Sequence, residues 1–449
     1  MFHGPWHFLF VAQGSTGDIL PPLAVACELN ERGHEVSFLT HTHFGELIHK
    51  RGLEFIDLQD EEHYRMIFDP DYWDPRKSLK RNVRFLIDAL RTQYELVARH
   101  AEIGRTVAVT SLNGMGVRIA HEKLGMPMIS AHICPWLLRS VESPSDMPLA
   151  NLPAFIRNWD PTGVGNRIYF RMADLLVYGP LFDKPINRFR AELNLPPLAQ
   201  TFHRWIHSPQ LIVGLFPQWF VHPYPRDWPE HTVLTNFPMD DDRDSTELPE
   251  GLREFLAGGD PPIVFSSGTG MAHVRDFFVH AVNACARLGR RGLLLTRFRE
   301  LAPEPLPRFV HYEPYVPLSN ILPRAAALVS HAGIGGASQA LAAGIPQLLA
   351  PMNFDQPDNA RRLNEFGVAR TVNWKTTNGK EMADHLAYLL QSEQVAENCR
   401  RLRIRFSKGS PVARSCDLME EFADRMLQMP NLRKMSSRTV FNPAYQPGR

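Results

Sequence analysis

Residues 331–361 read HAGIGGASQALAAGIPQLLAPMNFDQPDNAR, and this stretch decides the fold. The apolar run 326–330 before it and the run 347–350 inside it have the length of buried strands, and the small residues between them suit a helix. A strand, a glycine turn, a helix and a second strand form the unit of a parallel sheet that helices cover on both faces. The stretch therefore predicts an α/β fold.

The same stretch also predicts an anion-binding site. The first strand would deliver His331 to a glycine turn, and the helix is expected to start near residues 335–338. Free N–H groups and the positive end of the helix dipole attract a diphosphate, which glycines allow to approach the backbone. Asp355 and Gln356 follow the second strand, where a carboxylate beside an amide suits vicinal sugar hydroxyls. A glycine turn alone can serve close packing, so the prediction depends on all these elements occurring in this order.

A second unit of this kind opens the chain. Residues 8–12 are a strand-sized apolar run, residues 14–18 (GSTGD) are predicted as a turn, and a helix is expected from Pro21 to Gly33. The alternation of strands and helices stops in the proline-rich segment 217–261 and then restarts, which predicts two Rossmann-like domains, a linker and a cleft between them. Further strands are expected at residues 36–40, 107–110, 128–130, 263–266 and 292–296.

Composition excludes several classes of protein. The chain has 449 residues with 49 Lys and Arg against 48 Asp and Glu, so its charge gives no reason to expect a nucleic-acid partner. Five cysteines without CxxC spacing exclude a disulfide scaffold and argue against structural zinc, which favours a reduced, cytoplasmic protein. The N-terminus has no basic region of a signal peptide. The charge-free stretch 325–354 contains His331, Pro346 and Pro351 and is interpreted as buried strands instead of a membrane span.

With its neighbours, the stretch 331–361 resembles the donor-binding signature of family 1 glycosyltransferases, which have the two-domain GT-B fold. The resemblance implies that His331 and the glycine turn hold the diphosphate of a nucleotide sugar, while Asp355 and Gln356 hold sugar hydroxyls. Residues 315–318 (YVPL) fall where the family places a turn against the base, and the loop 267–270 is expected beside the diphosphate. The expected donor contacts are Ser267, Gly268, Thr269, Tyr315, Val316, His331, Gly333, Gly335, Gly336, Ala337, Ser338, Asp355 and Gln356.

The loop 14–21 (GSTGDILP) resembles the family's first loop, whose last polar residue is the catalytic base. A bacterial branch with antibiotic and sterol glycosyltransferases carries aspartate there, as this chain does at Asp18. The resemblance implies an inverting reaction in which Asp18 takes the acceptor proton, with no metal and no cofactor besides the nucleotide sugar as co-substrate. A purely structural role for Asp18, as the N-cap of the first helix, is the alternative.

The resemblance also implies a domain organisation. An acceptor-binding domain is expected at residues 1–235 and a nucleotide-sugar-binding domain at 236–410. A helix at 411–432 is expected to pack back on the first domain, with a tail at 433–449.

The acceptor half carries its own signals. Segments 71–75, 120–125, 205–210 and 215–220 resemble the rhamnosyltransferases that act on hydroxyalkanoyl lipids in rhamnolipid synthesis. The aromatic-rich segments 59–100 and 133–208 break the alternation, and such insertions commonly shape pockets, although ordinary core packing is the alternative. We therefore expect a dTDP-rhamnose or UDP-glucose type of donor and a lipophilic hydroxyl acceptor, with peripheral membrane contact left open. The expected acceptor contacts are Trp73, Phe85, Trp136, Phe155, Trp159 and Phe170.

Other functions remain as alternatives. Transfer to phenolic or natural-product aglycones, a nucleotide-sugar epimerase on the same fold, and a diphosphate-binding protein without turnover all share the donor motif. The first glycines are not GxGxxG and strand two does not end in an acidic residue, which argues against a dinucleotide enzyme. Residues 240–242 (DDD) lie among prolines and are interpreted as solvated linker, and His34 as a cap of the first helix–strand turn. No metal spacing is present, and no oligomeric state is indicated.

Overall fold

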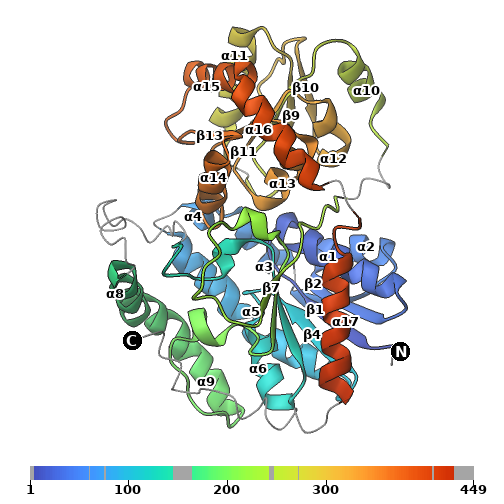
Figure 1. The fold of residues 1–449 in the computed structure, drawn as a ribbon, viewed down its shortest axis with the longest axis vertical. Coiled ribbons are helices and arrows are strands. Elements are labelled where there is room, and N and C mark those ends of the chain that lie inside the picture. Colours follow the sequence, from blue (N-terminus) through green and yellow to red (C-terminus); the bar gives the residue numbers. More distant parts are fainter. Residues whose placement is uncertain are drawn as a thin grey trace.

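The computed structural model of the chain describes residues 5–59, 61–74, 77–144, 164–241, 247–271, 273–406 and 409–428. Two parallel sheets, each flanked by helices, form two domains that lie one above the other in Figure 1. The N-terminal sheet has seven strands and the C-terminal sheet has six. These are the two Rossmann-like domains of the GT-B fold that the sequence predicts.

The N-terminal sheet has the strand order β3-β2-β1-β4-β5-β6-β7. Apolar residues on neighbouring strands lie in register at its centre, where Phe10 pairs with Phe38 on one side and Val109 on the other. Its strands are β1 (His7–Val11), β2 (Glu35–His41), β3 (Glu54–Gln59), β4 (Thr106–Thr110), β5 (Met128–His132), β6 (Leu211–Gly214) and β7 (Thr232–Leu234).

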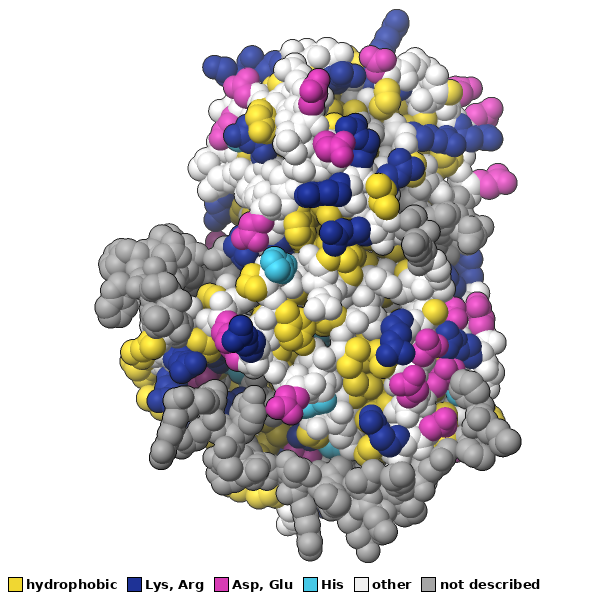
Figure 2. Space-filling view, viewed as in Figure 1, with side chains coloured by type: hydrophobic (Ala, Val, Ile, Leu, Met, Phe, Trp, Pro, Cys, Tyr) yellow, Lys and Arg dark blue, Asp and Glu magenta, His cyan; other side chains and the backbone are white. Residues whose placement is uncertain are grey.

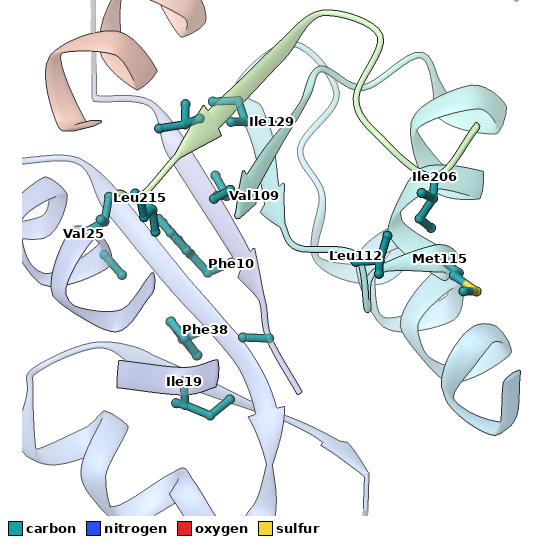
Figure 3. Packing of buried hydrophobic residues seen from close by; sticks show 14 of the residues in the cluster. Phe10, Ile19, Val25, Phe38, Val109, Leu112, Met115, Ile129, Ile206 and Leu215 are labelled. Carbon is teal, nitrogen blue, oxygen red and sulfur yellow. The ribbon is translucent and has the colours of Figure 1, made fainter. Parts of the chain in front are cut away.

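The N-terminal domain also contains helices and helical turns. They include α1 (Thr16–Glu31), α2 (Gly45–Lys50), α3 (Glu61–Arg65), α4 (Pro70–Trp73), α5 (Ser78–His100), α6 (Met115–Leu124), α8 (Val164–Ala173) and α9 (Lys184–Glu192). A π-helical segment, Asp174–Asp183, joins α8 to α9. Figure 3 shows buried side chains of the sheet, including Phe10, Phe38 and Val109, together with Ile19 and Val25 of α1.

The C-terminal sheet has the strand order β10-β9-β8-β11-β12-β13. Its strands are β8 (Ile263–Ser266), β9 (Gly292–Leu295), β10 (Val310–Glu313), β11 (Ala327–Ser330), β12 (Gln347–Leu349) and β13 (Ala369–Thr371). Its helices are α10 (Glu250–Ala257), α11 (Arg275–Leu288), α12 (Leu318–Ile321), α13 (Ile334–Ala343), α14 (Gln356–Glu365), α15 (Gly379–Gln391) and α16 (Glu393–Arg403).

The last described helix, α17 (Ala413–Gln428), returns to the N-terminal domain and lies beside α1 (Figure 1). Arg32 and His34 contact Glu420 at 2.9 and 3.0 Å, and Trp6 donates to Asp424 at 2.8 Å. The His34 backbone N–H donates to the oxygen of Leu29 at 3.1 Å and so closes the end of α1, which agrees with its predicted role as a cap, and its ring additionally anchors α17.

The segment 217–261 is more structured than a linker. It contains β7, which pairs with β6, and α10. Residues 240 and 241 are also not solvated linker. Asp240 pairs with Arg51 at 2.8 Å, and the buried Asp241 accepts hydrogen bonds from Ser319. The chain passes from one domain to the other at these two residues. Asp240 attaches it to Arg51 of the N-terminal domain, and Asp241 attaches it to Ser319 of the C-terminal domain.

Two local expectations need correction. Helix α1 begins at Thr16, not at Pro21, because Ser15 takes the N-cap position and residues 16–20 already have helical geometry. Pro21 and Pro22 therefore lie inside the helix. The segment 59–100, expected to be an irregular insertion, is mostly the long helix α5, which buries one face against the sheet.

Candidate active site

A cleft of about 380 Å³ lies between the two domains and is lined by residues from both. Its polar walls come from loops that follow β1, β4, β8, β9, β11 and β12. These loops lie at the carboxyl ends of parallel strands, where doubly wound sheets place their ligands.

Asp18 lies on the N-terminal wall of the cleft, in the first turn of α1. Its Oδ2 accepts hydrogen bonds from the backbone N–H of Ser15 at 2.8 Å and from Ser15 Oγ at 3.0 Å. A Cβ at residue 14 would lie 2.5 Å from this oxygen, so Gly14 is needed for the close approach. Burial raises the pKa of the Asp18 carboxyl, although the bonds from Ser15 favour its charged form. Asp18 thus supports the first turn of α1 and also presents a carboxylate to the cleft.

A buried amide network lies beside this wall. Asn113 donates to the backbone oxygen of Gln13 at 3.0 Å, and Gln93 donates to the backbone oxygen of Asn113 at 2.8 Å. Asn113 lines the cleft, and sequence analysis missed it because an asparagine after a strand has no distinctive spacing.

His331 lies on the opposite wall, directly after β11. Its ring lies between Gly268 and Gly333, because a Cβ at either position would come within 2.5 Å of a ring atom. Burial lowers the pKa of His331 to about 4, so the ring is neutral at neutral pH. A hydrogen bond with the backbone of Ser266 favours the charged form of the ring but does not outweigh burial. A neutral ring held in this way can donate one N–H to an anion.

The helix α13 begins beside His331 and points its N-terminus at the cleft. Its N-cap is Gly333, no side chain caps it, and its first turn has no acidic residue. Gly335 and Gly336 line the cleft, and a Cβ at residue 335 would meet nothing within 4 Å. The free N–H groups of this turn are therefore available to an anionic ligand. Ala337 and Ser338 are buried and do not line the cleft, whereas Gln339, which the sequence analysis missed, does.

Asp355 and Gln356 lie at the start of α14, on the same C-terminal wall. Burial and then the charge of Asp18 raise the pKa of Asp355 to about 7. One oxygen of Asp355 accepts from Asn359 at 2.6 Å. The side-chain oxygen of Gln356 accepts from the backbone N–H groups of Met352 and Asn353. Only the amide NH₂ of Gln356 is left for a ligand. Gln356 can therefore donate hydrogen bonds to a sugar hydroxyl but cannot accept them freely.

Of the remaining predicted donor contacts, most line the cleft and one does not. Gly268, Thr269, Tyr315 and Val316 line the cleft, whereas Ser267 is 1% exposed and does not. Arg297, which follows β9, is the only lysine or arginine among the described residues lining the cleft, and the sequence analysis did not identify it.

The acceptor side is aromatic, but not through all the predicted residues. Trp73, Phe85 and Trp136 line the cleft. Phe170 does not line the cleft, because its ring packs against the guanidinium of Arg139 at 3.9 Å. Phe155 and Trp159 lie outside the described residues. Three aromatic residues outside the set of expected acceptor contacts, Tyr178, Phe182 and Phe202, form a stacked wall with ring centroids 4.3 to 6.4 Å apart.

Two further features are absent from the described ranges. No group of three or more His, Cys, Asp or Glu side chains there could hold a metal ion. None of the helices described is long and apolar enough to cross a membrane.

Comparison with known families agrees with this geometry. Residues 8–143 match the glycosyltransferase family 28 N-terminal domain. Residues 179–415, more than half of the chain, match the family described as UDP-glucoronosyl and UDP-glucosyl transferase. The chain belongs to this second family and is a glycosyltransferase with the GT-B fold.

Individual relatives extend over nearly the whole chain. The O-mycaminosyltylonolide 6-deoxyallosyltransferase of Streptomyces fradiae is 29% identical, over 92% of this chain and 97% of the relative. The crystal structure of the glycotransferase of kitacinnamycin has a TM-score of 0.70 at 19% identity and covers 94% of this chain and 100% of its own. The spinosyn rhamnosyltransferase complexed with thymidine diphosphate has a TM-score of 0.64 at 17% identity, with coverage of 92% and 100%.

Proposed function

We propose that the chain is an inverting glycosyltransferase that moves a sugar from a nucleotide diphospho-sugar to a hydroxyl group of a lipophilic acceptor. One observation carries the proposal. The Asp18 carboxylate on the N-terminal wall and the uncapped start of α13 on the C-terminal wall face the same cleft.

In the proposed reaction, the acceptor oxygen attacks the anomeric carbon while its proton passes to the Asp18 carboxylate. The bond between that carbon and the diphosphate oxygen breaks on the opposite face, so the configuration inverts. General-base catalysis of this kind contributes about 10²- to 10⁴-fold to the rate. The raised pKa of Asp18 makes it a better proton acceptor than an ordinary aspartate.

The leaving diphosphate gains negative charge as its bond to the sugar breaks. In our proposal, the neutral His331 ring and the N–H groups at the start of α13 hold this charge, and Arg297 supplies the cation of the cleft. Asp355 and the amide of Gln356 hold sugar hydroxyls. The ring, the N–H groups and Arg297 together stabilise the negative charge of the leaving diphosphate, and the proposal includes no metal.

The donor is proposed to be of the dTDP-rhamnose or UDP-glucose type. The thymidine diphosphate bound to the structurally similar spinosyn rhamnosyltransferase supports a thymidine nucleotide, and the name of the matching family supports a uridine nucleotide.

The acceptor is proposed to be an amphiphile, first of all a hydroxy-fatty-acyl compound. Aromatic side chains of Trp73, Phe85, Trp136, Tyr178 and Phe182 line its half of the cleft, and they would cover an acyl chain. The resemblance to the rhamnolipid enzymes supports the same choice. A natural-product aglycone is the second candidate, favoured by the relative that acts on O-mycaminosyltylonolide. An epimerase would need no such apolar wall.

A mass-spectrometric screen tests the proposal. The purified chain is incubated with each of several dTDP- and UDP-sugars and a panel of hydroxy-acyl lipids, macrolides and phenols. A product whose mass equals acceptor plus sugar, formed only with the intact donor, is the expected result. Conversion of the donor to its epimer without any acceptor would overturn the proposal in favour of the epimerase.

A further inference from the structure

The helix α8 and the π-helical segment after it expose a row of large apolar side chains. Within the described residues, the structure leaves ten large hydrophobic side chains exposed, and five of them lie in the thirteen residues 164–176. They are Val164, Ile168, Met172, Leu175 and Leu176, with exposed fractions of 49 to 71%. Monomeric soluble proteins rarely expose such a group without a binding partner.

The opposite side of the same segment is also apolar. Phe170, Tyr178 and Phe182 are buried, and the last two line the wall of the active-site cleft. A helix that is apolar on both sides is normally enclosed by protein or by lipid. One side of this segment is enclosed by the domain, whereas no described residue gives the outer side the apolar cover that its composition calls for.

The charges around the outer side have one sign. Arg167, Arg171, Lys184 and Arg188 are exposed and form no ion pair with another described residue. The nearby acidic groups are engaged on the protein side. Asp174 pairs with Arg139 at 2.7 Å, and Asp183 accepts hydrogen bonds from the backbone N–H groups of Gln200 and Thr201. Among the described residues of this segment, the free charges are therefore all positive.

Hydrophobic and basic side chains also lie together at the left edge of the lower domain in Figure 2, where Figure 1 places α8. Apolar residues that insert among acyl chains, flanked by cations that contact phosphate groups, characterise helices that lie in the surface of an anionic membrane.

We propose that residues 164–188 form a docking surface for an anionic phospholipid bilayer. The apolar row, defined here as Val164, Ile168, Met172, Leu175 and Leu176, enters the acyl boundary, and the four free cations contact lipid phosphates. Because Tyr178 and Phe182 of the same segment line the cleft, docking places the aromatic acceptor wall next to the bilayer. An amphiphilic acceptor could then pass from the lipid into the cleft, a consequence that rests on the proposed function.

Co-sedimentation of the full chain with vesicles tests this surface. The vesicles consist of phosphatidylcholine alone or of phosphatidylcholine mixed with phosphatidylglycerol, and the salt concentration is varied. The test variant is Ile168→Ser/Leu175→Ser/Leu176→Ser, and a second variant is Arg167→Gln/Arg171→Gln. The matched control is Ile103→Ser, which changes an apolar side chain of similar exposure (62%) outside the surface.

The wild-type chain and the Ile103→Ser control should bind the anionic vesicles and lose binding as salt rises. The triple serine variant should lose about tenfold or more of its partition coefficient, and the double glutamine variant should lose most of its preference for anionic lipid. Equal binding of the wild type and the triple variant, or no vesicle binding at all, would overturn the proposal. So would self-association, measured by analytical ultracentrifugation, that the triple variant abolishes while vesicles have no effect.

Turnover of a short, water-soluble acceptor without vesicles separates this inference from the proposed function. The triple variant should keep wild-type turnover there, because its three side chains do not line the cleft. If the wild type does not turn over this acceptor and the screen of donors and acceptors also gives no product, the proposed function is refuted, whereas the vesicle experiment still tests the docking surface by itself.

Discussion

Asp18 and Asp355 face one cleft from opposite domains, and the charge of Asp18 is the second cause, after burial, of the raised pKa of Asp355. In this coupling the charge of Asp355 is not among the causes that shift the pKa of Asp18, so Asp18 ionises first and Asp355 ionises at higher pH. The relationship joins the proposed base of one domain to the proposed sugar ligand of the other.

The pH dependence of turnover should show this coupling. The proposed base acts when ionised, and its pKa is raised, so kcat/KM should increase with pH through a pKa above that of an ordinary aspartate. Asp355→Asn should leave the rising part of the profile at the same pH, even if the maximum is smaller, because Asp355 is still neutral where Asp18 ionises. A rising part that moves to lower pH in Asp355→Asn would contradict this order of ionisation.

His331→Ala should weaken the binding of the intact donor and of the free nucleotide diphosphate. A hydrogen bond to a charged group contributes about 1.5–3 kcal/mol, so a loss of roughly ten- to a hundredfold is expected. Isothermal titration calorimetry measures both affinities. His331→Gln, which keeps an N–H donor, should recover part of the loss, and an unchanged diphosphate affinity in His331→Ala would exclude His331 from the site.

Gly333→Ala should have a similar effect without removing the histidine. The new Cβ would lie 2.5 Å from His331 Nε2, so the ring must move away from its position beside α13. We expect weaker donor binding, measured by the same calorimetry. Gly335→Ala on the same helix is the control for folding, because its Cβ meets nothing within 4 Å, and its melting temperature should equal or exceed that of the wild type. Normal diphosphate binding by Gly333→Ala would show that the ring position does not matter.

Acceptor affinity should increase with the length of the acyl chain. Each methylene buried against the aromatic wall adds about 0.8 kcal/mol, until the cleft is full. A series of hydroxy-acyl acceptors, measured as kcat/KM at a fixed donor concentration, checks this. A flat series together with efficient use of small hydrophilic alcohols would reject the lipophilic acceptor and leave the glycosyltransferase class unaffected.

The central strands could be predicted from the sequence and the edge strands could not. Strands such as β1, β8 and β11 are buried on both faces and are continuous apolar runs. The edge strands β3, β7, β10 and β13 are short or carry polar residues such as Glu54, Asp57, Glu313 and Arg370, because one side has no neighbouring strand. The internal strand β6 was missed although it is apolar, because it follows directly on the irregular segment 133–208.

The candidate site, like the sheets, could be predicted from the sequence only in part. Asp18, His331 and Asp355 were predictable because each follows a recognisable strand and lies in a motif of fixed spacing. Arg297, Asn113 and Tyr178 reach the cleft only through the tertiary fold. Phe170 was misplaced because an aromatic residue in an insertion looks the same whether it faces a ligand or packs against Arg139.

The turnover number of Asp18→Asn at saturating donor and acceptor tests the central claim most directly. Asparagine is nearly isosteric and can still accept the bonds from Ser15, so α1 and the affinity for the donor should be unchanged. Loss of the base should reduce kcat by about 10²- to 10⁴-fold. A variant that keeps more than about a tenth of wild-type turnover would contradict the assignment of Asp18 as the general base.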